Sequence, residues 1–200
     1  MNRDAYNRIA RQWGEARSGF FGRERDYLEL LLAPLAPGST VLDLGCGTGR
    51  PLAEQVVARG HRVLGVDQSE AMLEQARQRL PEECWLLAPM ECFAADRPYQ
   101  AAIIWDSLFH VPRGEHAGIL RRVVDGLPAG GRLMLTMGGS AQPAFTDFMF
   151  GEEFFYDSHT PEETGQILRD CGCDILLGEF MNLPDGGRER GRYAMVAEKA

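Results

Sequence analysis

The sequence lacks the features that mark secreted and membrane proteins. The stretch from Met1 to Trp13 contains Arg3, Asp4, Arg8 and no apolar run, so it predicts neither a signal peptide nor a membrane span. We find no internal repeat and no low-complexity tract. The 200 residues therefore predict one domain, residues 1–200, in a soluble cytoplasmic protein.

The cysteines are few, and their spacing is not that of a disulfide framework or a zinc site. The five cysteines are an odd number and form no Cys-x-x-Cys, and their spacing suggests no zinc site. We expect reduced, mostly buried thiols and no metal.

Basic residues are fewer than acidic ones, and the formal net charge is −8. Proteins that bind nucleic acid need a basic surface to displace counterions from phosphate. The two short basic clusters, Arg121–Arg122 and Arg188–Arg192, are predicted to be solvated surface. A nucleic-acid partner is therefore disfavoured.

From about residue 40 onward, short apolar runs alternate with amphipathic stretches. The predicted strands are Val41–Leu44, Arg62–Val66, Cys84–Leu87, Ala101–Trp105 and Arg132–Met137. The predicted helices between them are Pro51–Arg59, a helix capped by Ser69 that runs to Leu80, and Arg113–Leu127. This alternation predicts a parallel sheet covered on both faces.

The pattern changes after the fifth strand. The aromatic-rich stretch 138–156 is predicted to be irregular. Residues 140–158 are predicted to form an aromatic insertion near the substrate side. Thr160 and Glu163 then form the signature of a capping box at the start of a helix. Two closing strands, Asp174–Glu179 and Arg192–Glu198, are predicted to form an antiparallel hairpin through the turn residues Pro184–Gly187.

The strongest signal is the run Val41-Leu-Asp-Leu-Gly45-Cys-Gly47-Thr-Gly49, where a predicted strand ends and a helix begins. Glycine lets the backbone lie directly against a ligand, and the helix start presents unpaired N–H groups. The dinucleotide fingerprint requires glycine three positions after the second one. Arg50 stands there, which disfavours a pyrophosphate-binding NAD enzyme.

Asp67 ends the second predicted strand, about 20 residues past the glycine loop. An acid at this position accepts hydrogen bonds from ribose hydroxyls. Its alternative role is to cap the following helix from the surface. In combination with the loop, we interpret Asp67 as a ribose ligand.

These motifs resemble those of class I (Rossmann-like) S-adenosylmethionine-dependent methyltransferases. The segments Val41–Gly49, Val66–Met72 and Leu127–Leu135 are similar to the family's first, second and post-fourth-strand motifs. The resemblance implies an α/β fold, a three-layer Rossmann-like sandwich with a mostly parallel seven-stranded sheet and one antiparallel strand. It also implies S-adenosylmethionine bound over the strand ends.

The resemblance assigns roles to individual cofactor-binding residues: Asp43 at the methionine end, Gly45, Gly47 and Gly49 in the contact loop, Asp67 on the ribose, and Gln68 and Met72 beside the adenine. Related proteins usually have an aspartate that contacts the adenine amino group, and this chain has Pro89 at about that place. Met90 and Glu91 are therefore the predicted adenine contacts.

The segment Trp105–Pro112 follows the fourth strand and faces the point of methyl transfer. The resemblance places Asp106 and Ser107 near the methionine end of the cofactor, with Ser107 in the substrate pocket. His110 is the candidate general base or substrate ligand, because imidazole titrates near neutral pH. Its alternative role is to pack beneath the helix after Pro112. Asp106 and His110 alone are too few ligands for a metal.

The N-terminal residues 1–35 resemble the lid helices of small-molecule methyltransferases. Tyr6, Trp13 and Arg17 are the predicted covering residues, with Trp13 on the cofactor and the other two in the substrate pocket. The alternative is a helix that simply buries Ile9 and Trp13. At the other side, Tyr156 and His159 are predicted to line the substrate pocket.

The leading interpretation is a methyltransferase acting on a small molecule, as a monomer or homodimer. One alternative is methylation of protein or RNA, for which an open groove beside the cofactor site would be expected. An NAD-dependent oxidoreductase and a non-catalytic nucleoside-binding protein are two further alternatives. Fold resemblance does not separate them.

Overall fold

The computed structural model describes residues 2–185 and 190–200. The helices are α1 (Arg3–Ala16), α2 (Glu24–Leu32), α3 (Leu52–Ala58), α4 (Glu70–Arg79), α5 (Arg113–Gly126) and α6 (Pro161–Asp170). The strands are β1 (Thr40–Leu44), β2 (Arg62–Asp67), β3 (Cys84–Leu87), β4 (Ala101–Ile104), β5 (Arg132–Gly138), β6 (Phe145–Met149), β7 (Glu152–Tyr156), β8 (Cys173–Asn182) and β9 (Arg192–Lys199). Two 3₁₀ turns, η1 (Met90–Cys92) and η2 (Leu108–His110), complete the set.

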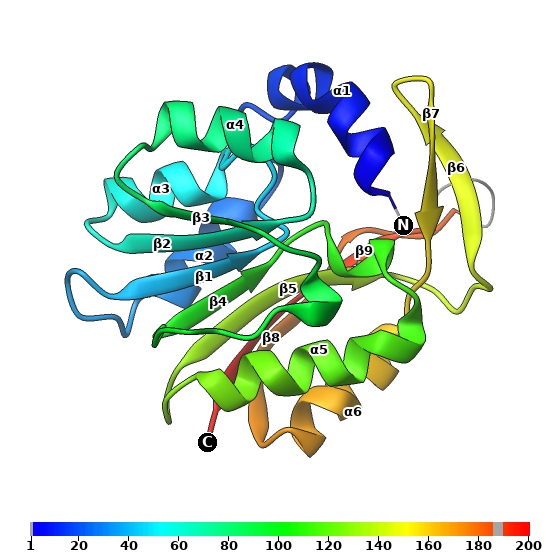
Figure 1. Ribbon diagram of the computed structural model, residues 1–200. Coiled ribbons are helices and arrows are strands. Elements are labelled where there is room, and N and C mark those ends of the chain that lie inside the picture. Colours follow the sequence, from blue (N-terminus) through cyan, green and yellow to red (C-terminus); the bar gives the residue numbers. More distant parts are fainter. Residues whose placement is uncertain (1, 186–189) are drawn as a thin grey trace.

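Seven strands form one sheet in the order β3-β2-β1-β4-β5-β9-β8 (Figure 1). Strands β1 to β5 pair in parallel, whereas β9 runs antiparallel to both β5 and β8. The predicted fold class is therefore confirmed. The chain moves outward from β1 to β3 and then returns to place β4 on the other side of β1. This reversal leaves a crevice at the carboxyl ends of β1 and β4, where ligands bind in open α/β sheets.

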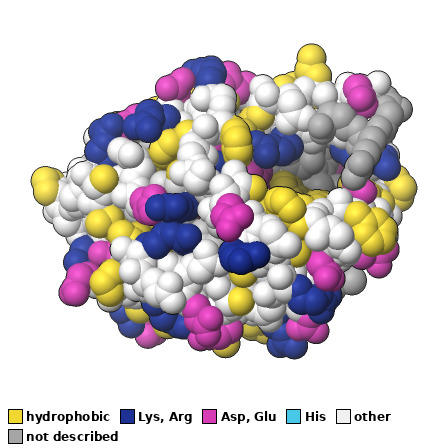
Figure 2. Space-filling view, turned by 90° about the horizontal axis from the view of Figure 1, so that it is seen from above, with side chains coloured by type: hydrophobic (Ala, Val, Ile, Leu, Met, Phe, Trp, Pro, Cys, Tyr) yellow, Lys and Arg dark blue, Asp and Glu magenta, His cyan; other side chains and the backbone are white. Residues whose placement is uncertain are grey.

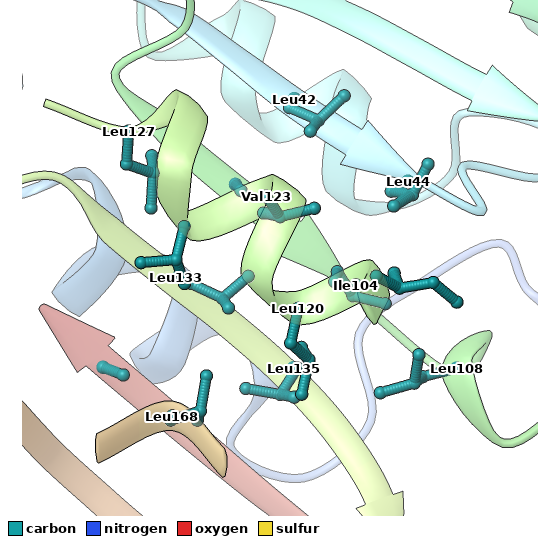
Figure 3. Packing of buried hydrophobic residues seen from close by; sticks show 14 of the residues in the cluster. Leu42, Leu44, Ile104, Leu108, Leu120, Val123, Leu127, Leu133, Leu135 and Leu168 are labelled. Atoms are coloured by element: carbon teal, nitrogen blue, oxygen red, sulfur yellow. The ribbon is translucent and has the colours of Figure 1, made fainter. Parts of the chain in front are cut away.

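Helices cover both faces of the sheet, with α5 and α6 on one face and α2, α3 and α4 on the other (Figure 1). Figure 3 shows Leu120 and Val123 of α5 packed among Leu42, Leu44 and Leu135 of the strands. Each fully buried leucine contributes about 1.5–3 kcal/mol by leaving water. This packing holds the ends of β1 and β4 in place beneath the crevice.

The aromatic stretch after β5 is a two-stranded antiparallel hairpin of β6 and β7, so the prediction of an irregular segment is wrong. Met149 pairs with Glu152, which leaves Phe150 and Gly151 as a two-residue turn. Both have positive φ, 52° and 83°, as a type I′ turn requires. Asn-Gly or Asp-Gly usually marks such a turn, and Phe-Gly is not a recognisable signal.

Helix α1 bridges the hairpin and α4 above the sheet edge (Figure 1). Ala5 and Ile9 bury their side chains against Phe154 of β7. On the other side, the side-chain oxygen of Asn7 accepts a 2.7 Å hydrogen bond from Ser69, the N-cap of α4. The second predicted lid helix lies elsewhere, because α2 packs its apolar face into the core beneath the sheet.

Two local predictions near the chain's end are confirmed. The Thr160 hydroxyl accepts from the Glu163 N–H at 3.2 Å, and the Glu163 carboxylate accepts from the Thr160 N–H at 2.9 Å, which completes the capping box. Strands β8 and β9 are antiparallel neighbours. The predicted turn between them falls partly outside the described residues at Gly186 and Gly187, as does Arg188 of the basic cluster. No described helix has the length and apolarity needed to cross a membrane.

Candidate functional site

A crevice enclosing about 830 Å³, its mouth included, lies under α1 at the carboxyl ends of β1, β2 and β4. It brings together fourteen of the predicted site residues: Tyr6, Trp13, Arg17, Asp43, Gly45, Gly47, Asp67, Gln68, Met72, Met90, Glu91, Asp106, Ser107 and His110. The crevice also has lining residues that were not predicted from the sequence, namely Cys46, Arg50, Leu52, Val66, Ala88, Trp105 and Val111.

The glycine loop and Asp67 are joined by direct hydrogen bonds. The Gly47 N–H donates to one Asp67 carboxylate oxygen at 2.9 Å, and the Ser69 N–H donates to the other at 2.8 Å. Burial raises the pKa of Asp67, and these N–H groups oppose that rise. Each oxygen retains a lone pair for a further donor. The carboxylate is thus fixed in orientation and still able to accept two hydroxyl groups.

Two of the three loop glycines have different structural roles. Gly45 has φ of 87°, and a Cβ there would stand 2.3 Å from the Ser107 Cβ, so no larger residue fits. Gly49 instead packs against Trp85, 3.2 Å from where its Cβ would be, and it is not among the lining residues of the crevice. The structure therefore places Gly49 behind the loop, where it serves packing of the loop on the sheet.

The floor of the crevice carries two buried carboxylates. Burial raises the pKa of Asp43 to about 7, and the nearby Asp67 carboxylate contributes to this rise. In the described part of the chain, neither Asp43 nor Asp67 is in an ion pair. Two buried carboxylates of this kind fit a ligand that brings positive charge and hydroxyl groups. Asp43, which lies near the end of β1 just before the glycine loop, would repel a pyrophosphate at that loop.

The predicted adenine side is lined by Gln68, Met72, Met90 and Glu91. Met90 and Glu91 belong to η1, which directly follows Pro89. The Met90 methyl carbon reaches across to the glycine loop, where it would lie 3.4 Å from a Cβ placed on Gly45. Met72 and Met90 therefore give this side of the crevice an apolar surface, and Pro89 contributes no carboxylate to it.

His110 is buried and engaged at both ring nitrogens. Its Nε2 lies 2.8 Å from the Tyr6 hydroxyl, and its Nδ1 lies 2.8 Å from the Asn2 amide nitrogen and 3.0 Å from the Phe155 carbonyl oxygen. Burial lowers the pKa of His110 to about 4, so the ring is neutral at pH 7. The histidine thereby ties α1 to the hairpin and holds the Tyr6 hydroxyl in the crevice.

A buried charge cluster lies at the far end of the crevice. Glu24 is fully buried and accepts from Arg17 at 2.8 Å and from the Trp105 indole N–H at 3.0 Å. Asp106 has φ of 50° and lies 3.2 Å from Arg192. Glu24 was not predicted as a site residue, and Arg192 was predicted to be solvated surface. Their partners Trp105 and Asp106 come from a segment that is distant from both in the sequence.

The last two predicted pocket residues are not in this crevice. Tyr156 lies behind His110, with ring centroids 4.8 Å apart, and lines a second cavity. His159 lines neither of these two cavities. Its Nε2 lies 3.1 Å from the Arg113 carbonyl oxygen, and its ring meets His116 edge-on. His159 packs between α5 and the start of α6, and its place in the substrate pocket stays a prediction.

The chain is similar to known proteins in both sequence and structure. The profile of a family described as a methyltransferase domain matches residues 41–131. A trans-aconitate 2-methyltransferase of Azoarcus sp. (strain BH72) is 36% identical over 109 residues, which cover 54% of this chain and 42% of that protein. The match thus spans less than half the length of this curated relative.

Two solved structures share the fold over almost the whole chain. Magnesium protoporphyrin IX methyltransferase from Synechocystis PCC 6803 with bound S-adenosylmethionine has a TM-score of 0.74 at 20% identity, covering 99% of this chain and 95% of that one. The [4+2]-cyclase SpnF has a TM-score of 0.74 at 16% identity, covering 98% and 94%. At these identities the likeness shows the fold alone.

Proposed function

We propose that the chain is a class I (Rossmann-like) S-adenosylmethionine-dependent methyltransferase and that it transfers a methyl group from S-adenosylmethionine to a small molecule; the methyltransferase-domain profile over residues 41–131 and the similarity to a trans-aconitate 2-methyltransferase support this proposal. The observation that carries this proposal is the pair of buried carboxylates, Asp43 and Asp67, at the glycine loop. Their position at the point where the strand order reverses is where such folds bind ligands.

Different residues of the crevice would bind different parts of the cofactor. Bound S-adenosylmethionine would supply a methyl group made electrophilic by its positive sulfonium. Asp67 would accept the ribose hydroxyls, with its orientation fixed by the Gly47 and Ser69 N–H groups. Asp43 would balance the positive charge of the methionine end. Met72 and Met90 would provide the apolar surface for the adenine.

The protein's main task is then to hold the acceptor in line with the methyl group. The Tyr6 hydroxyl and Ser107 line the crevice and are the groups we assign to acceptor contacts. Where the acceptor must lose a proton, we assign His110 to act through Tyr6, because the Tyr6 hydroxyl is hydrogen-bonded to the imidazole Nε2.

A small acceptor is supported by the charge of the chain and by the relatives. The formal charge of −8 opposes binding to nucleic acid. The names of two similar proteins, a trans-aconitate 2-methyltransferase and a magnesium protoporphyrin IX methyltransferase, specify small molecules. A cytoplasmic location and a monomeric or homodimeric state stay predictions, which cell fractionation and light scattering would test.

Calorimetry with S-adenosylmethionine, S-adenosylhomocysteine and NAD tests the cofactor assignment. We expect both adenosyl ligands to bind and NAD to give no heat. Asp67→Ala should weaken S-adenosylmethionine binding at least about tenfold, or about 1.4 kcal/mol. Asp174→Ala, an exposed change on β8, is the control and should have no effect. Unchanged affinity in Asp67→Ala, or binding of NAD alone, would refute the assignment.

The acceptor is best sought with isotopically labelled S-adenosylmethionine and a metabolite extract. Products that carry the label only in the presence of the protein identify candidate acceptors. Labelling of RNA or protein in place of small molecules would refute the small-acceptor proposal, and cofactor binding with no labelled product would favour a non-catalytic binding protein.

A further inference from the structure

A second cavity lies beside the cofactor crevice, between η2, the hairpin and the start of β9. It encloses about 1160 Å³, its mouth included, and Phe109, Pro143, Phe145, Tyr156, Arg190 and Arg192 are among its lining residues. On the face shown in Figure 2 the molecule is hollowed, with hydrophobic side chains inside the hollow and basic side chains at its edge. Nothing in the cofactor assignment uses these residues.

The two cavities share a wall. The His110 ring lines the crevice and lies 4.8 Å from the Tyr156 ring and 4.9 Å from the Phe109 ring, both of which line the second cavity. Arg192 lines the second cavity and contacts Asp106 of the crevice at 3.2 Å. The second cavity therefore adjoins the crevice, and an acceptor held in it must extend its reacting atom past His110 to reach the proposed point of methyl transfer.

The apolar part of the second cavity is built from flat surfaces. Phe145 and Tyr156 are stacked with an interplanar angle of 13° and ring centroids 5.2 Å apart. Phe109 continues the series, 6.0 Å from Tyr156 at 31°. Rings aligned in this way form a smooth wall, which matches the face or edge of a planar molecule better than a branched aliphatic one.

The charged part of the cavity favours an anion because of Arg190. Its guanidinium lies 4.5 Å over the Phe145 ring and hydrogen-bonds the Gln142 side-chain oxygen. Both of these partners among the described residues are uncharged. Arg190 therefore brings a positive charge to the cavity wall, and its planar donors suit a carboxylate.

The other charged groups of the lining have partners of their own. Asp157 is matched by Arg113, whose Nε lies 2.5 Å away, and Arg192 is matched by Asp106 of the crevice. The two further acids of the lining, Asp147 and Asp185, are each engaged in interactions as well. Arg190 is thus the group that we assign to ligand binding.

We propose that the second cavity holds the body of the acceptor, a flat, conjugated or aromatic molecule bearing a carboxylate that pairs with Arg190, and that the reacting atom of the acceptor extends past His110 to Tyr6 and Ser107 in the crevice. The ring wall of Phe145, Tyr156 and Phe109 orients the flat body toward His110. This inference rests on the proposed function, which it deepens by naming the class of acceptor.

The test is calorimetry on the full chain saturated with S-adenosylhomocysteine, using three probes. trans-Cinnamate is flat and anionic, trans-cinnamamide is flat and neutral, and hexanoate is anionic and aliphatic. We expect cinnamate to bind most tightly. Arg190→Gln should weaken cinnamate binding at least about tenfold, to the level of cinnamamide, since a charge-assisted hydrogen bond is lost. Phe145→Leu should weaken cinnamate and leave hexanoate unchanged.

The matched control is Arg169→Gln, which removes an exposed arginine from α6 and should leave all three probes unaffected. S-adenosylhomocysteine binding is measured in each variant, so a failure of the cofactor assignment appears separately from a failure of the cavity assignment. Equal binding of cinnamate and cinnamamide, an Arg190→Gln variant with normal cinnamate affinity, or absence of cinnamate binding at millimolar concentration would overturn the proposal.

Discussion

Replacing Asp43 with asparagine should stabilise the ligand-free protein and weaken cofactor binding at the same time. Asp43 is 3% exposed, and burial is the main reason that its pKa rises from 3.8 to about 7. In the unfolded chain the carboxyl group titrates near its ordinary value of about 3.9. The folded protein therefore disfavours the ionised form relative to the unfolded chain.

The sign of the effect follows from proton counting. Between about pH 4 and pH 7 the folded state holds more protons at Asp43 than the unfolded state does, so stability falls as the pH rises through this window. Above pH 7 the whole penalty is present. A shift of about three pKa units corresponds to about 4 kcal/mol, which is an upper figure because the site relaxes. An asparagine side chain carries no charge, so Asp43→Asn should gain about 1–4 kcal/mol at pH 8.

Urea unfolding followed by circular dichroism at pH 8 and at pH 4 measures this gain. The free energy of unfolding of Asp43→Asn should be much larger than that of the parent at pH 8. At pH 4 the two values should be nearly equal, because the carboxyl group of the folded parent is mostly protonated there. Asp174→Asn, at an exposed position on β8, serves as the control. S-adenosylmethionine affinity should drop at least about tenfold. A variant that is no more stable than the parent at pH 8 would refute the burial argument, and unchanged affinity would refute the charge-balance role.

The remaining predictions concern the same crevice. S-adenosylmethionine affinity should fall about fivefold between pH 7 and pH 6, because a smaller fraction of Asp43 is ionised; calorimetry with constant affinity over this range would count against it. Tyr6→Phe should lower kcat about tenfold or more with any acceptor that loses a proton, while the cofactor Kd stays the same; equal kcat would remove the relay from His110 through Tyr6. Glu24→Gln should cost about 3–5 kcal/mol in urea unfolding, since it leaves a buried arginine unpaired, whereas Glu29→Gln in a surface pair should cost less than about 1 kcal/mol.

The cofactor half of the site was predictable because its residues are close together in sequence. Asp43, Gly45 and Gly47 lie within one strand and its following loop, and Asp67 ends the neighbouring strand. Parallel strands bring their carboxyl ends to the same edge of the sheet, so the spacing alone predicts that these groups meet. The hydrogen bond from Gly47 to Asp67 is a direct result of the β1–β2 register.

Gly49 and His159 show that neighbours in the sequence do not determine which groups a side chain or a glycine packs against. The alternation of three glycines suggests three equivalent ligand contacts, yet the indole of Trp85 on β3 determines what fits at Gly49. His159 is three residues from Tyr156, but the chain turns toward α6 and directs the imidazole to Arg113. In both cases the residue that is contacted, Trp85 or Arg113, belongs to a different helix or strand, so the spacing of residues along the sequence does not predict the contact.

The proposed acceptor site is assembled from segments that are far apart in sequence. Tyr6 comes from α1, Tyr156 from β7 and Arg190 from the approach to β9, and they meet only because α1 spans the crevice and the hairpin packs against it. Tyr156 and Arg190 do not line the crevice that contains Asp43 and Asp67, so changes at these two positions are expected to alter acceptor binding and leave cofactor binding unchanged. We therefore expect cofactor and acceptor recognition to be separable, with His110 and Asp106 at the boundary where the two cavities touch.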